Sequence, residues 1–143
     1  MASKITYRDN SKEWVNFFNK AKHRGLTAIG LMAEKYAQKN CPVDTGLLRN
    51  SITYAIAGYE AHVKQYRRDN FKTGESKKHT YKGYDGVMDG KKDEAVYVGT
   101  NVDYAPYIEL GAKNSQGIFF LRKAATEHTP EYGKIMKGSL ENA

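Results

Sequence analysis

The amino-acid sequence predicts an α+β domain. A long N-terminal helix and a C-terminal helix are expected to pack on a small antiparallel sheet, with a long basic loop or hairpin projecting from it. Three observations support this fold class: a helical apolar period over residues 11–40, alternation of apolar and polar residues over residues 51–66, and a strand, turn and short helix over residues 96–111. The 143 residues suit a single domain, residues 1–143.

The first predicted helix spans residues 11–40, and Pro42 ends it. Its apolar residues, which recur at steps of three and four, are Trp14, Phe17, Phe18, Ala21, Gly25, Ala28, Ile29, Met32 and Tyr36. An aromatic stripe at this spacing usually belongs to a core, so we expect it to be buried in the domain rather than to bind a partner. Gly25 and Gly30 mark either the close approach of a neighbouring segment or a bend.

The sheet is predicted from residues 51–66 and 94–99. Gly46 shapes a turn, and the alternating residues 51–57 follow it as a strand with one face on the core. Residues 60–66 are predicted to form a second strand that pairs with the first as an antiparallel hairpin. Residues 94–99 supply the third strand.

Residues 96–111 form a strand, a tight corner and a short helix. Strand-forming residues at 96–98 give way to turn residues at 99–101. Asp103 is expected to cap the short helix, with Pro106 in its first turn. Gly111 lies just past the helix end, where the backbone often turns left-handed.

The C-terminal part is predicted to be helical over residues 119–128. Thr129 and Pro130 either kink this helix or start a new one, with Thr129 as its cap and Pro130 at its first position. An apolar stripe continues beyond them through Tyr132, Ile135, Met136 and Leu140.

Residues 67–93 differ in character from the rest of the chain. They carry eight cations and five acidic residues, a net charge of +3, and their apolar residues show no helical period. We interpret them as a mobile basic loop or an extended hairpin. Two roles remain open: a solvated insertion with no fixed role, or contact with DNA or an acidic neighbour. The cations are Arg67, Arg68, Lys72, Lys77, Lys78, Lys82, Lys91 and Lys92.

No catalytic or metal-binding constellation is evident in the sequence. The four histidines show no metal-ligand spacing, and neither a phosphate-binding glycine motif nor a nucleophile elbow occurs. The single cysteine, Cys41, is interpreted as a small residue at a helix end rather than a catalytic thiol. Asp103 and Glu109 fall on different faces of a short helix, which disfavours a joint acid–base or metal role. We therefore expect no enzyme, no metal and no cofactor.

The net charge of +7 and the sequence pI near 9.4 favour anionic partners, either nucleic acid or an acidic protein surface. No apolar run approaches the length that spans a bilayer, and the N-terminus lacks a hydrophobic signal core. We expect no membrane contact, and a product that stays in the cytoplasm where it is made.

Four segments together resemble a family of tailed-phage proteins. They are Pro42-Val43-Asp44-Thr45-Gly46-Leu47-Leu48-Arg49-Asn50-Ser51-Ile52, Val96-Tyr97-Val98-Gly99-Thr100, Tyr104-Ala105-Pro106-Tyr107-Ile108-Glu109-Leu110-Gly111, and an aromatic-led helix from Phe119. They resemble the minor tail or tail-completion components typified by the tenth gene product of a lambdoid siphophage. The segment between Tyr66 and Glu94 is longer and more basic than the core of that family.

The resemblance implies mainly structural roles for the matched residues. These are Asp44, Thr45, Gly46, Leu48, Arg49, Gly99, Thr100, Tyr104, Ala105, Tyr107, Glu109 and Gly111. The glycines are expected to shape turns, and Tyr104 to anchor the short helix against the core. Glu109 is expected to pair with a cation, for which Arg49 is the candidate because both belong to matched motifs.

The resemblance also implies a function. The chain would be a structural virion protein, a tail-completion or head–tail connector subunit made in the host cytoplasm. Relatives of this architecture form rings, commonly hexameric, that contact other tail or neck proteins. The basic loop would line the DNA channel through weak, sequence-independent phosphate contacts, or clasp an adjacent ring. The alternative is a nucleic-acid-binding accessory protein of a phage or prophage that uses the basic loop 67–92.

Overall fold

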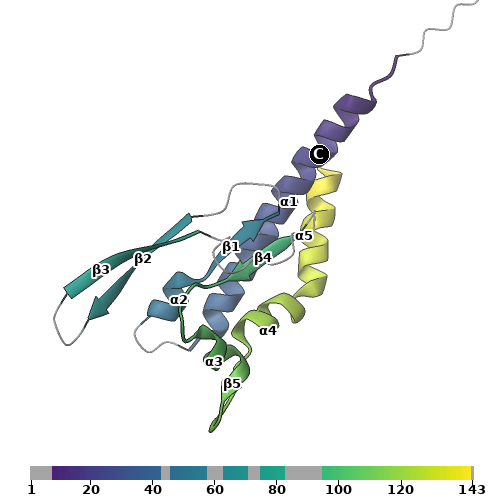
Figure 1. The fold of residues 1–143 in the computed structure, drawn as a ribbon. Coiled ribbons are helices and arrows are strands. Elements are labelled where there is room, and N and C mark those ends of the chain that lie inside the picture. The colour runs from purple at the N-terminus through teal and green to yellow at the C-terminus, as the bar shows by residue number, and fades with distance from the viewer. Residues whose placement is uncertain (1–7, 43–45, 58–62, 71–74, 83–94, 143) are drawn as a thin grey trace, which may run out of the picture.

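The computed structural model describes residues 8–42, 46–57, 63–70, 75–82 and 95–142 (Figure 1). The helices and strands of this part are α1 (Ser11–Asn40), α2 (Leu47–Ser51), β1 (Thr53–Ile56), β2 (Val63–Asn70), β3 (Glu75–Lys82), β4 (Val96–Gly99), α3 (Ala105–Leu110), β5 (Gly111–Ala112), β6 (Ser115–Gln116), α4 (Phe120–Thr126) and α5 (Thr129–Glu141). The predicted α+β class is confirmed, with a long N-terminal helix, C-terminal helices and small antiparallel sheets.

The central sheet has two strands, β1 and β4, which pair antiparallel from Thr53 opposite Gly99 to Ile56 opposite Val96. The predicted hairpin between residues 51–57 and 60–66 is therefore wrong. All four residues of β1 are buried, so β1 needs an apolar partner, and β4 offers one. Residues 60–62 of the predicted second strand lie outside the described residues, and residues 63–66 belong to β2, which pairs with β3.

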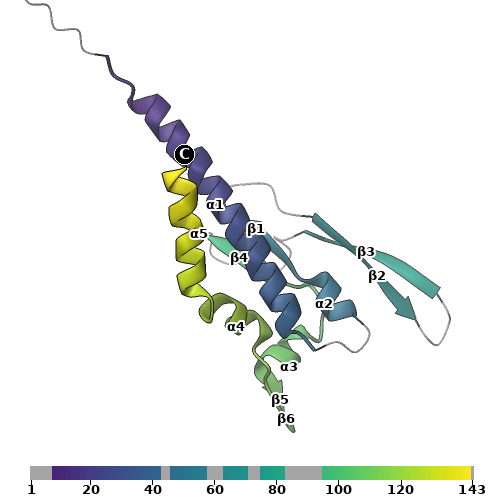
Figure 2. The same ribbon diagram turned by 180° about the vertical axis from the view of Figure 1, so that it is seen from behind.

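The basic segment is partly a hairpin. Strand β2 pairs antiparallel with β3, from Val63 opposite Lys82 to Asn70 opposite Glu75. In both views this hairpin and α5 lie on opposite sides of α1 (Figures 1 and 2). The rest of the predicted basic loop, residues 71–74 and 83–93, lies outside the described residues.

Helix α1 lies across the sheet, and α5 lies along α1 (Figure 2). Both contacts depend on glycines. A Cβ at Gly30 would lie 2.5 Å from the Tyr54 ring, and one at Gly25 would lie 2.7 Å from Met136 Sδ. Of the two alternatives considered for these glycines, the structure shows the close approach of a neighbouring segment.

Two apolar clusters form the core of the described chain. One joins the end of α1 to α2, α3 and α4, and consists of Ala37, Cys41, Leu48, Ile52, Ala105, Phe120 and Ala124. The other lies between α1 and the sheet and consists of Leu26, Tyr54 and Ile56. Phe120 is fully buried, so the start of α4 is fixed firmly in the first cluster.

Three local predictions need correction. Residues 47–51 form the short helix α2 after Gly46, which has φ +78°, and the strand begins only at Thr53. Tyr104, not Asp103, is the N-cap residue of α3, and its side chain makes no capping hydrogen bond. Thr129 begins a new helix, α5, but the N-cap position belongs to His128.

Candidate assembly interface

The first two motif segments meet through a chain of hydroxyl groups. The Ser51 Oγ donates to the carbonyl oxygen of Leu48 at 2.7 Å, and Thr100 Oγ1 accepts the Val102 N–H at 3.2 Å. The two hydroxyl oxygens lie 2.5 Å apart. Because the Ser51 proton is already donated to Leu48, the Thr100 hydroxyl donates to Ser51. This chain fastens α2 to the turn that follows β4.

Glu109 joins α3 to α4. Its Oε2 accepts the Leu121 N–H and its Oε1 accepts the Arg122 N–H, each at 2.9 Å. These N–H groups lie in the first turn of α4, where a helix leaves its amide groups without internal partners and its dipole favours negative charge. The expected pairing of Glu109 with Arg49 is wrong, because the carboxylate instead caps a helix twelve residues further along the chain.

Gly111 makes the turn between α3 and α4 possible. It has φ +95°, and a Cβ there would lie 2.6 Å from the Ser115 carbonyl oxygen. The turn brings the Ile118 N–H to the Ile108 carbonyl at 2.9 Å, which holds the start of α4 against α3. The predicted left-handed glycine after α3 is confirmed.

The remaining motif residues divide between the core and the surface. Leu48 and Ala105 are buried in the first cluster, and Gly99 is buried opposite Thr53. Tyr104, which was expected to anchor α3, is 38% exposed and belongs to neither core cluster, whereas Ala105 and Ile108 make the core contact of α3. Asp44 and Thr45 lie outside the described residues.

A shallow groove lies beside these motifs. It has a volume of about 570 Å³ and runs between the turn after β4, α3 and the start of α4. Its lining residues are Thr100, Asn101, Val102, Asp103, Ala105, Pro106, Glu109, Leu110 and Leu121. Leu110 at its edge is 70% exposed, and the neighbouring Tyr107 is 65% exposed. This end of the described chain therefore presents exposed apolar side chains to solvent.

A second apolar surface lies on the first turns of α1, which extend beyond the end of α5 (Figure 1). Every residue from 11 to 20 is exposed. Trp14 is 61% exposed, Phe17 48% and Phe18 51%. The prediction that the aromatic stripe is buried is wrong for this part. Helical periodicity identifies an apolar face, but it does not show whether the same chain covers that face.

Cations occupy facing positions in the β2–β3 hairpin. Its register places Arg67 opposite Lys78 and Arg68 opposite Lys77, so four of the predicted contact residues occupy two adjacent rungs. Lys82 is at the end of the same ladder, opposite Val63. Lys72, Lys91 and Lys92 lie outside the described residues.

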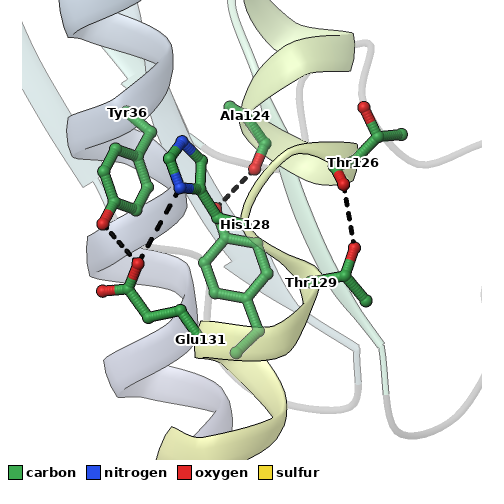
Figure 3. A network of polar contacts seen from close by, with 7 residues as sticks. Tyr36, Ala124, Thr126, His128, Thr129 and Glu131 are labelled. Atoms are coloured by element: carbon green, nitrogen blue, oxygen red, sulfur yellow. Dashed lines mark hydrogen bonds and ion pairs between the residues drawn. The ribbon is translucent and has the colours of Figure 1, made fainter.

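A polar cluster locks α1 to α5 (Figure 3). The Tyr36 hydroxyl donates to Glu131 Oε2 at 2.5 Å, and the Tyr36 ring stacks on His128 with centroids 3.5 Å apart. The hydrogen bond to Glu131 raises the pKa of Tyr36. The Tyr132 hydroxyl donates to the Ala124 carbonyl at 2.5 Å, and burial raises the pKa of Tyr132 to about 12. The cluster fixes the direction in which α5 leaves α4.

Cys41 is buried at the end of α1, as interpreted from the sequence. Burial raises the pKa of its thiol to about 11, so the reactive thiolate is scarce near neutral pH. Within the described ranges, no group of three or more His, Cys, Asp or Glu residues is placed to hold a metal ion. No helix in those ranges is both long and apolar enough to cross a membrane.

Sequence reasoning missed three features of the structure: the Ser51–Thr100 contact, the capping of α4 by Glu109 and the exposure of Trp14. The first two join residues 49 and 12 positions apart, and no local spacing reveals such contacts. The only available signal was that these residues fall within the motif segments.

Comparison with known proteins gives one result. A family model described as "Bacteriophage HK97-gp10, putative tail-component" matches residues 9–111, which is well over half of the chain. No curated protein and no solved structure matches the chain significantly.

Proposed function

Since the chain belongs to the HK97-gp10-like family of bacteriophage tail components, we propose that it is a tail-completion or head–tail connector subunit that acts by ring assembly. The proposed ring, a hexamer by analogy with relatives, is located at the tail or neck of the virion. Its other partners are the adjacent tail or neck proteins. Assembly takes place in the host cytoplasm.

One observation carries the proposal. Large apolar side chains stay exposed on the first turns of α1, at Trp14, Phe17 and Phe18, and on α3, at Tyr107 and Leu110. Helix α3 lies near the opposite end of α1 (Figure 1). A lone chain gains nothing from presenting such groups to water, whereas an assembly subunit buries them against its neighbours. Contacts between unlike surfaces of identical subunits generate closed rings when the rotation between subunits closes.

The basic hairpin supports a role beside DNA. In a connector ring, cations that face the channel contact phosphates without reading sequence, and weak contacts let DNA pass. The register of the β2–β3 ladder gives one cation pair for each face, Arg67 with Lys78 and Arg68 with Lys77, and the pair on the channel side would provide such contacts. This part of the proposal rests on the positive charge of these side chains and on the register of β2 against β3.

Electron microscopy of particles from a phage that lacks this protein tests the proposal. We expect tails of abnormal length without heads, or heads that never acquire tails, and we expect the purified protein to restore joining. Normal particles in the absence of the protein would refute the proposed role. Negative-stain images of the purified protein at high concentration test ring formation separately.

The alternative function is a nucleic-acid-binding accessory protein, and the same four cations favour it. A binder should shift a DNA fragment at low protein concentration and lose the complex steeply as salt rises. Arg67→Ser combined with Lys78→Ser would then reduce both the affinity and the salt dependence. A tail subunit should bind DNA weakly and still attach to tails.

A further inference from the structure

The exposed row on α1 continues a surface that α5 already covers. Further toward the C-terminus of α1, the Ser139 hydroxyl of α5 donates to the Ala21 carbonyl at 2.6 Å. Gly25 approaches Met136 at the same interface. Helix α5 ends at Glu141, so Phe17 and Trp14, which lie about one and two turns before Ala21, are beyond its reach. The row therefore has the character of a helix-packing face that no helix or strand among the described residues covers.

We propose that the exposed row on α1 of one copy, Trp14, Phe17 and Phe18, docks in the groove beside α3 of a second copy. The proposal rests on the ring assembly proposed above and names the contact that builds it. The first turns of α1, which carry the row, and helix α3, which borders the groove, lie far apart along the described chain in both views (Figures 1 and 2). The row therefore meets the groove of another copy, and the contact is head-to-tail.

The charges of the two surfaces are complementary. The charged residues that line the groove are Asp103 and Glu109, both acidic. The exposed charged residues over positions 8–24 are four cations and two acids, a net charge of +2, namely Arg8, Lys12, Lys20, Arg24, Asp9 and Glu13. Docking in the groove joins opposite charges, whereas pairing two copies of α1 would bring like charges together.

The size of the contact explains why it would favour closure. A large aromatic side chain carries about 150–250 Å² of surface, so the exposed halves of three of them offer on the order of 300 Å². A stable interface buries about 800 Å² on each partner. One such contact is therefore weak by itself. In a closed ring every copy makes two contacts and no apolar end is left in water.

The single tryptophan of the chain lies in the proposed contact, so its fluorescence reports on docking directly. In the dilute protein, Trp14 should emit at long wavelength and be quenched readily by acrylamide, because it is 61% exposed. As the concentration of the full-length protein rises, we expect emission at shorter wavelength and weaker quenching, in step with the mass measured by light scattering.

Leu110→Asp changes only the groove and leaves Trp14 in place. We expect it to raise the concentration required for the Trp14 change at least tenfold. Leu31→Asp is the matched control, because Leu31 is 51% exposed on α1 and belongs to neither surface. It should behave like the unaltered protein. Association without any change at Trp14, or an unchanged transition in Leu110→Asp, would overturn the proposal.

Engineered cysteines test the direction of the contact. Phe17→Cys combined with Leu110→Cys should form a ladder of disulfide-linked multimers under mild oxidation. Cys41 should not interfere, since it is buried and its thiol pKa is about 11. Phe17→Cys combined with Leu31→Cys is the control and should give no ladder. A dimer of the single variant Phe17→Cys would indicate pairing between two α1 helices and overturn the head-to-tail contact.

The failure of this contact and the failure of the proposed function give different results. Rings in electron micrographs without the ladder would overturn the docking of α1 in the groove and leave ring assembly intact. A chain that stays monomeric with Trp14 exposed up to its solubility limit would also overturn the docking. Only normal particles from a phage without this protein would overturn the role in the tail.

Discussion

The hydroxyl oxygens of Ser51 and Thr100 lie 2.5 Å apart, and Ser51 is fully buried. They belong to segments 49 residues apart in the chain, and their contact fixes α2 against the turn after β4. Each hydroxyl also bonds to the backbone, to the Leu48 carbonyl and the Val102 N–H. The loss of either hydroxyl therefore leaves the other, the buried Ser51 or the half-buried Thr100, without one of its partners.

We expect Thr100→Val and Ser51→Ala each to lower the free energy of unfolding by about 1–3 kcal/mol, the cost of an unsatisfied buried polar group. Because the two hydroxyls share one hydrogen bond, the double variant should lose less than the sum of the single losses, with a coupling of roughly 0.5–3 kcal/mol. Urea unfolding followed by circular dichroism measures all four proteins.

Thr126→Val is the control for this cycle. The Thr126 hydroxyl donates to the Arg122 carbonyl on an exposed surface of α4, so its loss should change stability by less than about 0.5 kcal/mol. Strictly additive losses in the double variant would show that Ser51 and Thr100 do not act together.

The capping of α4 by Glu109 gives a second prediction. Glu109→Ala removes both acceptors from the Leu121 and Arg122 N–H groups, and we expect a loss of about 1–3 kcal/mol in unfolding free energy. Glu109→Gln keeps one acceptor and should lose less. Thermal unfolding measures the series, with the exposed Glu127→Ala as control. Equal melting of Glu109→Ala and Glu127→Ala would contradict the capping role.

The fold class and the extent of α1 were predictable because they depend on local patterns. A helical period persists over residues 11–40, and the helix has these bounds. The left-handed glycines at 46 and 111 were predictable for a similar reason, since few other residues adopt a positive φ.

Strand pairing was not predictable from the same patterns. Residues 53–56 and 63–66 both have strand character, so the sequence favours pairing the two strands that are adjacent in the chain. In the structure β1 pairs with β4 instead, and all four residues of β1 are buried. Contacts made through space, such as Glu109 with Leu121, depend likewise on the completed fold. The period of α1 also gave no indication that α5 stops short of Trp14.

The glycine contacts of α1 give a third prediction, which compares two Gly→Ala changes in helices. At Gly30 the new methyl group would lie 2.5 Å from the Tyr54 ring, so we expect overpacking to cost about 1–3 kcal/mol. At Gly133 in α5 nothing lies within 4 Å of the new Cβ, so the better helix propensity of alanine should add about 0.5–1 kcal/mol. Urea unfolding should show opposite signs. A neutral or stabilising Gly30→Ala would refute close packing of α1 on β1.

Alkaline pH tests the burial of Cys41. Burial raises the pKa of this thiol from 9.0 to about 11, although the charge of Arg49 lowers it. Between these pH values the unfolded chain loses the thiol proton before the folded chain does. The protonated thiol therefore contributes fully to the free energy of unfolding below pH 9, and this contribution is lost as the pH rises to about 11.

The free energy of unfolding should therefore fall more steeply over this range in the unaltered protein than in Cys41→Ala. Tyr132, with a pKa near 12, contributes equally to both proteins, so their difference isolates the thiol. Parallel pH profiles would mean that solvent reaches Cys41 in the folded chain.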